Sequence, residues 1–117
     1  MRADVFVYGT LRRSEQAHEL LGFDAIFIRE TLTKPLYTLY QLGWYPGLVE
    51  GGTTQVKGEL WSIMDLRWTY LDEYEGVPED YIRKKIALVG GECPYTYIYV
   101  GSLSNAVLLS DGDWTTR

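Results

Sequence analysis

One short segment near the N-terminus constrains the fold more than any other, and it reads Val5-Phe6-Val7-Tyr8-Gly9-Thr10-Leu11. The β-branched and aromatic residues up to Tyr8 predict a buried or half-buried strand. Gly9 then predicts a turn in which a side chain would obstruct a close approach. Backbone N–H groups after such a glycine have no strand partner, so they can hold an anion or a developing oxyanion. The alternative is an ordinary glycine turn at the end of a strand.

Further segments with strand character follow along the chain. Alternating or continuous apolar patterns predict strands over residues 24–32, 36–42, 55–64, 81–89 and 94–100. Gly90-Gly91 separates the last two, which predicts a hairpin. Residues 43–47 read as a stiff aromatic turn and residues 50–54 as a loop. The strand at 55–64 has no polar face, so we expect a curved or closed sheet that is covered on both sides.

Two segments have helical spacing. Ser14 to Leu21 places Ala17, Leu20 and Leu21 on one face, with Ser14 as a candidate cap and Gly22 as the end.

The second helix is expected from Asp65, as N-cap, to about Tyr74. Its apolar face would contain Leu66, Tyr70, Leu71 and Tyr74, and Gly76 and Pro78 would close it. Neighbouring strands joined by short turns, with two short helices, favour an α+β mixed sheet over a doubly wound one. The 117 residues are expected to form a single domain, residues 1–117.

Composition excludes several classes of function. The net charge is −5 and the basic residues are scattered, so we expect no nucleic-acid partner. The single cysteine, Cys93, and the single histidine, His18, predict no internal disulfide, no metal site and no cofactor. No apolar run has the length of a membrane span and no signal region is evident at residues 1–10, so a cytoplasmic protein without a membrane partner is expected. The ten tyrosines suit either a polar-lined pocket or a subunit contact, in a monomer or a homodimer.

The sequence Leu71-Asp72-Glu73-Tyr74-Glu75-Gly76 places a carboxylate, Glu75, at the end of the second helical pattern. A carboxylate there lies at the unfavourable end of the helix dipole, which would raise its pKa toward the range that proton transfer requires. The alternative is a solvated charge on the last helical turn.

Together, Tyr8-Gly9-Thr10-Leu11 and Leu71-Asp72-Glu73-Tyr74-Glu75-Gly76 resemble the characteristic segments of the γ-glutamylcyclotransferase-like family, which includes AIG2-like proteins and γ-glutamylamine cyclotransferases. Tyr81-Ile82-Arg83, Tyr45-Pro46-Gly47 and the tail around Trp114 are also similar to that family. The resemblance implies a small mixed β-barrel of about six strands with two short helices packed outside it.

The resemblance also implies a reaction. The α-amino group of a small γ-glutamyl compound would attack its own γ-carbonyl, giving 5-oxoproline and a free amine, with Glu75 as general acid and base. The turn at Gly9, Thr10 and Leu11 would hold the α-carboxylate or the oxyanion, with Tyr8 as a wall. Tyr81 would donate a hydrogen bond in the pocket, or else only pack against the barrel.

Two other interpretations stay open at this point. A binding or regulatory module of the same fold would keep the anion-binding turn at Gly9 but would not catalyse a reaction. A structural homodimer would bury Tyr95, Tyr97 and Tyr99 between subunits and leave no cavity beside Glu75.

Overall fold

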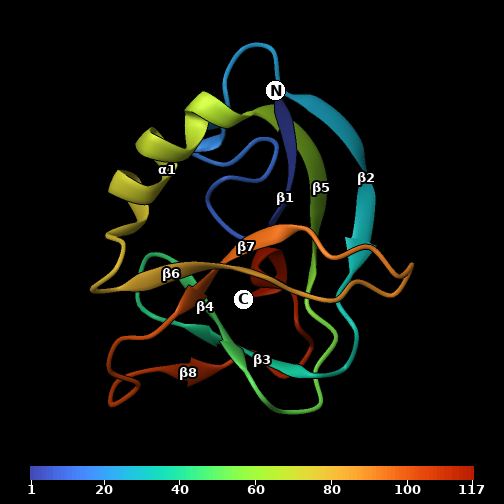
Figure 1. Cartoon of the computed structure of the whole chain (residues 1–117). Helices are drawn as coiled ribbons and strands as arrows, with labels where there is room; N and C mark the ends of the chain where they lie inside the picture. Colours follow the sequence, from blue (N-terminus) through green and yellow to red (C-terminus); the bar gives the residue numbers. More distant parts are fainter.

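The computed structural model describes residues 1–117 as one curled, eight-stranded sheet with a single α-helix packed outside it (Figure 1). Along the sheet the strand order is β2-β5-β1-β7-β4-β3-β8, and β6 pairs with β7. The strands are β1 (Arg2–Val7), β2 (Ile26–Leu32), β3 (Tyr37–Gln41), β4 (Pro46–Glu50), β5 (Lys57–Met64), β6 (Tyr81–Lys85), β7 (Tyr95–Tyr99) and β8 (Val107–Leu108). The α+β class and the mixed sheet predicted from the sequence are confirmed.

Strand β1 lies in the middle of the sheet. It pairs antiparallel with β5 and parallel with β7, and β7 also pairs parallel with β4. The predicted hairpin around Gly90-Gly91 is present, because β6 and β7 pair antiparallel with Ile82 opposite Ile98. The turn that follows β1 therefore leaves the sheet beside β7 and β4, not at an edge.

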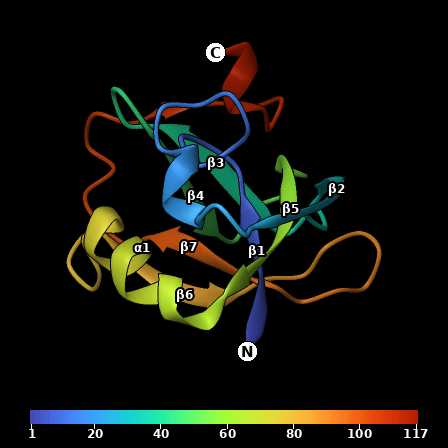
Figure 2. The ribbon, with the colours of Figure 1, turned by 90° about the horizontal axis from the view of Figure 1, so that it is seen from above.

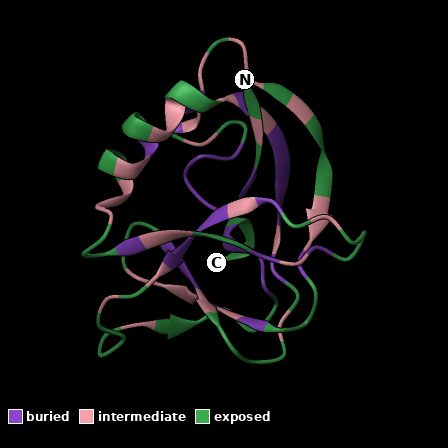
Figure 3. Ribbon diagram, in the orientation of Figure 1, coloured by how far each residue is buried: buried purple, intermediate pink, exposed green.

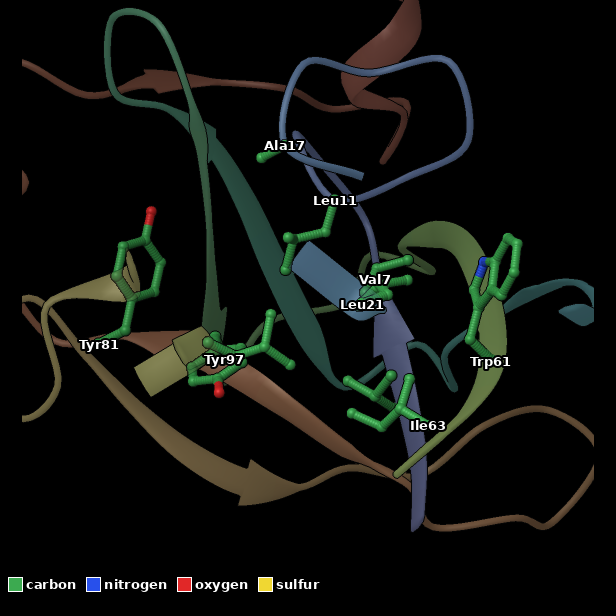
Figure 4. Packing of buried hydrophobic residues seen from close by; sticks show 10 residues of the cluster. Val7, Leu11, Ala17, Leu21, Trp61, Ile63, Tyr81 and Tyr97 are labelled. Atoms are coloured by element: carbon green, nitrogen blue, oxygen red, sulfur yellow. The ribbon is translucent and has the colours of Figure 1, made fainter. Parts of the chain in front are cut away.

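The core lies on both faces of the central strands. Val5 and Val7 of β1 belong to one buried cluster, whereas Phe6 and Leu60 belong to a second cluster on the other face. Figure 3 shows the buried colour along β5 and over the second half of β1, and Figure 4 shows the buried residues of the first cluster from close by. Burial on both faces explains why β5 shows no polar side in its sequence.

The structure has eight strands where the sequence predicted about six. The two additional strands are Pro46–Glu50, in a region read as turn and loop, and Val107–Leu108. Proline and glycine at the start of β4 conceal its strand character, because Pro46 occupies the first position, where a missing N–H is tolerated. Strand β8 has two exposed residues and pairs only with the end of β3, so it has no local pattern to detect.

The first predicted helix is wrong over most of its length. Only His18–Leu21 is helical, as a single 3-10 turn. Ser14 has a φ of 68°, a left-handed conformation that does not begin a helix. The N–H of Ala17 donates to the carbonyl of Thr10, so the segment folds back on the turn after β1.

The second predicted helix is α1 (Trp68–Glu75), preceded by a 3-10 turn at Asp65–Arg67. It ends at Gly76, as expected. The predicted buried face is wrong except for Leu71, because Leu66, Tyr70 and Tyr74 are all exposed. Leu66 lies in the 3-10 turn, which has a different period from the α-helix, whereas Tyr70 and Tyr74 lie within α1 on its exposed side.

The C-terminal tail packs against the turn that follows β1. Trp114 is fully buried, and it begins a 3-10 turn at Trp114–Thr116. Figure 2 shows the loop after β1 and the C-terminal 3-10 turn at the same end of the molecule. No helix in the structure has both the length and the apolar character that crossing a bilayer requires.

Candidate active site

A cavity of about 270 Å³ opens between the turn after β1, the end of α1 and strands β6 and β7. Every residue that the sequence singled out as a site residue lines it. These residues are Tyr8, Gly9, Thr10, Leu11, Glu75 and Tyr81. The fold therefore brings the Gly9–Leu11 turn and Glu75 together, although more than sixty residues separate them in the chain.

The turn needs glycine at position 9 because Pro46 packs against it. A Cβ on Gly9 would lie 2.7 Å from the Cδ of Pro46 and closer still to its Cγ, so any other residue would overlap the ring. The backbone of Gly9 is not in the left-handed region. Its role is close approach, as the sequence indicated.

The turn keeps three backbone donors unpaired. The N–H groups of Gly9, Thr10 and Leu11 donate to no acceptor in the protein. The next two N–H groups are paired: that of Arg12 donates to the carbonyl of Gly9 at 3.0 Å, and that of Arg13 donates to Oε1 of Glu59 at 2.9 Å. Successive free N–H groups of this kind form an anion-binding concavity.

Glu75 is the last residue of α1 and its side chain faces the same cavity. Burial raises its pKa from 4.5 to about 7. The sequence had attributed a raised pKa to the helix dipole, whereas the structure attributes it to loss of solvent around the carboxylate. At neutral pH such a carboxyl group both accepts and releases protons.

The hydroxyl groups of Tyr8 and Tyr81 hold the cavity wall together. Tyr8 donates to the carbonyl of Tyr97 at 2.6 Å and accepts from the N–H of Leu48 at 3.1 Å. Tyr81 donates to the carbonyl of Pro46 at 2.6 Å. Burial raises the pKa of both tyrosines, so both remain protonated donors. Both residues line the cavity, and their hydroxyl groups bind backbone carbonyls of β7 and β4.

Several residues at the site had no predicted role in it. The hydroxyl of Tyr74 lies 2.9 Å from Oγ1 of Thr10, which links the helix end directly to the turn. The hydroxyl of Tyr97 donates to Oδ1 of Asp72 at 2.7 Å. The sequence signal that points to Tyr97 is the alternation of Tyr95, Tyr97 and Tyr99, which places the three rings on one face of β7.

Only two of the three alternating tyrosines of β7 reach the cavity. Tyr97 and Tyr99 line the cavity, whereas Tyr95 packs edge-on against Trp68 with ring centroids 5.6 Å apart. Figure 4 shows the hydroxyls of Tyr81 and Tyr97 pointing in opposite directions. Tyr97 is buried within the chain itself, so it is not available to a subunit contact.

The ionisable side chains of the cavity are acidic and phenolic. Glu75 and Asp80 are its carboxylates, and no lysine, arginine or histidine lines it. Nowhere in the chain do three His, Cys, Asp or Glu side chains converge as metal ligands would. A bound anion would therefore be held by backbone N–H groups, beside a carboxyl group that titrates near neutrality.

Comparison with known proteins agrees with this geometry. Residues 5–116 match the family model described as gamma-glutamyl cyclotransferase, AIG2-like. A Vibrio cholerae protein provisionally named a gamma-glutamylcyclotransferase is 41% identical over 113 residues, covering 97% of this chain and 96% of the relative. The Danio rerio gamma-glutamylaminecyclotransferase A is 31% identical over 126 residues, covering 97% of this chain and 74% of that protein.

Solved structures show the same fold. The solution structure of ytfP from Escherichia coli has a TM-score of 0.76 and 32% identity, and covers 97% of this chain and 96% of that one. A mouse AIG2-like protein has a TM-score of 0.75 and 25% identity, and covers 85% of this chain and 78% of that one. With a family match over almost its whole length and relatives above 30% identity, this chain belongs to the AIG2-like gamma-glutamyl cyclotransferase family.

Proposed function

We propose that the protein cyclises a small γ-glutamyl compound by intramolecular aminolysis. The α-amino nitrogen of the glutamyl group attacks its own γ-carbonyl carbon, and the bond from that carbon to the departing nitrogen breaks. The products are 5-oxoproline and a free amine or amino acid. Nucleophile and electrophile belong to one molecule, so the protein has only to fold the substrate and move protons.

Glu75 is the proposed general base and general acid. It takes a proton from the attacking nitrogen, which is not nucleophilic while it is an ammonium, and it returns a proton to the departing nitrogen. A carboxyl group with a pKa of about 7 performs both steps near neutral pH. Membership of the family and the name of the zebrafish relative agree with this chemistry.

The unpaired N–H groups of Gly9, Thr10 and Leu11 are the proposed anion site. They would hold the substrate's α-carboxylate or the oxyanion that forms at the γ-carbon. Tyr8 and Tyr81 would form the walls on which the glutamyl chain folds.

One observation carries the proposal more than any other. Glu75, with its desolvated carboxyl group, and the three turn residues with free N–H groups line one small cavity. A binding module needs the donors but has no need of a proton acceptor beside them.

The test is release of 5-oxoproline from a panel of γ-glutamyl amino acids, γ-glutamyl-lysine and glutathione. Wild type should turn over at least one member, and Glu75→Gln should lose at least about 100-fold in kcat, which is the scale of general acid and base catalysis. The matched control is Glu73→Gln, which changes an exposed carboxylate on the same helix and should keep wild-type kinetics.

Turnover that survives Glu75→Gln would exclude Glu75 as the base. A folded wild-type protein that releases no 5-oxoproline from any member would instead favour the binding-module interpretation.

A further inference from the structure

The position of Glu75 in the cavity depends on the backbone that carries it. Desolvation is the one resolved influence on its carboxyl group, and no hydrogen-bonding side chain holds that group in place. A base that no neighbour holds is aligned with its substrate only if the end of its helix is fixed.

Helix α1 is too small to fix itself. It has eight residues, and Leu71 is the only buried one. Isolated helices of this length are marginal in water, so contacts with the rest of the molecule must set where the helix ends.

Asp72 closes the end of the helix through its backbone. Its carbonyl accepts the N–H of Val77 at 3.0 Å, and the carbonyl of Glu73 accepts the N–H of Gly76 at 3.2 Å. Gly76 has a φ of 71°, so the two bonds form a Schellman motif around Glu75.

The side chain of the same Asp72 binds the sheet. Its Oδ1 accepts the hydroxyl of Tyr97 at 2.7 Å, and its Oδ2 lies 3.7 Å from Nη2 of Arg83. Tyr97 is 3% exposed and forms part of the cavity wall on β7. A short bond from a neutral donor to a carboxylate is about twice as strong as a bond between neutral groups.

We infer that Tyr97 is a positioning residue for the proposed reaction: through its bond to Asp72 it fixes the end of α1, and with it Glu75, against the sheet side of the cavity. The inference rests on the proposed function. Loss of this bond leaves the fold and the substrate site intact but lets the base move. Displacement of a catalytic group by about 1 Å can cost about 100-fold in rate.

The first test is Tyr97→Phe, which removes one oxygen and keeps the ring. We expect kcat to fall at least about tenfold while KM changes by less than about threefold, the pattern of a lost interaction that matters only in the transition state. The matched control is Tyr37→Phe. Tyr37 is also buried and its hydroxyl accepts the N–H of Ala87 at 2.9 Å, but it does not line the cavity. The control should keep the wild-type kcat at a comparable loss of stability.

A second pair of variants tests the acceptor. Asp72→Asn keeps an oxygen for the Tyr97 hydroxyl, so its kcat should stay within about threefold of wild type, whereas Asp72→Ala should fall as Tyr97→Phe does. Because the Asp72 side chain is 29% exposed, these variants also report on the bond if Tyr97→Phe does not fold.

The outcomes separate this inference from the proposed function. If Glu75→Gln is inactive but Tyr97→Phe and Asp72→Ala keep the wild-type kcat, the inference is overturned and the proposed function stands. A raised KM at constant kcat would also overturn it, because Tyr97 would then be a binding residue. A wild-type protein inactive on the whole panel would overturn the proposed function, and the inference with it.

Discussion

At the scale of single residues, the properties of Glu75 follow from what surrounds it. The end of α1 places the carboxyl group in a cavity lined by tyrosine rings and the turn after β1. Loss of water there raises its pKa to about 7, and no cation lines the cavity to lower it again. The same desolvation predicts both a pH profile and a stability cost.

The pH dependence of kcat/KM should show the titration of Glu75. The base acts only when deprotonated, so kcat/KM should rise with pH and reach half its plateau near pH 7. The measurement is initial rates from pH 5 to pH 9, with circular dichroism at each pH to exclude unfolding. Half-maximal activity near pH 4.5 would show that the carboxyl group is solvated in the free enzyme.

Glu75→Gln should stabilise the protein at alkaline pH. The folded pKa of about 7 lies above the ordinary value of 4.5, so the folded state binds the proton more tightly and loses stability as pH rises from 4.5 to 7. Above pH 7 the neutral glutamine avoids this cost, which is about 1–3 kcal/mol.

Urea unfolding of wild type and Glu75→Gln at pH 8 and pH 4 measures the difference. The gain should be present at pH 8 and absent at pH 4, where the carboxyl group is protonated in both states. Equal stability of the two proteins at pH 8 would contradict a desolvated Glu75.

At the scale of elements, the site lies where the C-terminal end of strand β1 meets the C-terminal end of helix α1. Pro46 at the start of β4 packs on Gly9, and Tyr74 of α1 bonds to Thr10. The shape of the turn therefore depends on a strand that pairs with β3 and β7, not with β1.

Gly9→Ala should disturb this contact. The new methyl group would overlap the ring of Pro46, which should cost about 1–3 kcal/mol in the free energy of unfolding and raise KM by displacing the N–H donors. Pro46→Ala removes the overlapping ring atoms, so the double variant should lose less stability than the sum of the single variants. Strict additivity in urea unfolding would show that Pro46 is not the reason for glycine at this position.

At the scale of the whole molecule, a buried charge cluster joins the turn, the central sheet and the tail. Arg12 is 6% exposed and lies 3.7 Å from Oε2 of Glu59 on β5 and 3.3 Å from Oδ1 of Asp113 in the tail. Glu59 also accepts from the indole N–H of Trp61 at 3.0 Å. The cluster connects residues about 100 positions apart and begins immediately after the Gly9–Leu11 turn.

Arg12→Met should be one of the most damaging substitutions in the chain. It removes the buried cation that Glu59 and Asp113 share and leaves each carboxylate only a half-exposed one, Arg13 or Lys57, which should lower the free energy of unfolding by about 3 kcal/mol. Lys84→Met is the control, because Lys84 and its partner Glu50 are half exposed and the pair is worth about 1 kcal/mol or less. Similar losses for the two variants in urea unfolding would show that the cluster is effectively solvated.

Much of the fold was predictable because short segments of the sequence specify their own secondary structure. The β-branched run at Val5–Val7, the alternation at Tyr95–Tyr99 and the glycine after Glu75 each specify their own conformation within a few residues. Strands β4 and β8 were missed because β4 opens with Pro46 and Gly47 and β8 has only two residues, so their pairing with β3 and β7 leaves little local pattern. The segment after Ser14 was read as a helix because its apolar spacing is helical, but its hydrogen bonds go to the preceding turn.

The sequence by itself determined the mixed α+β class, the strand and turn at residues 5–11, the helix that ends at Glu75 and the family to which the chain belongs. Only the tertiary structure decided that the turn and Glu75 line one cavity, that the hydroxyls of Tyr8 and Tyr81 bind backbone carbonyls, and that Tyr97 reaches Asp72. The physical reason is the distance along the chain over which each effect acts. Dihedral preferences and side-chain periodicity act over a few residues, whereas desolvation, and the pKa that follows from it, depends on groups that only folding brings together.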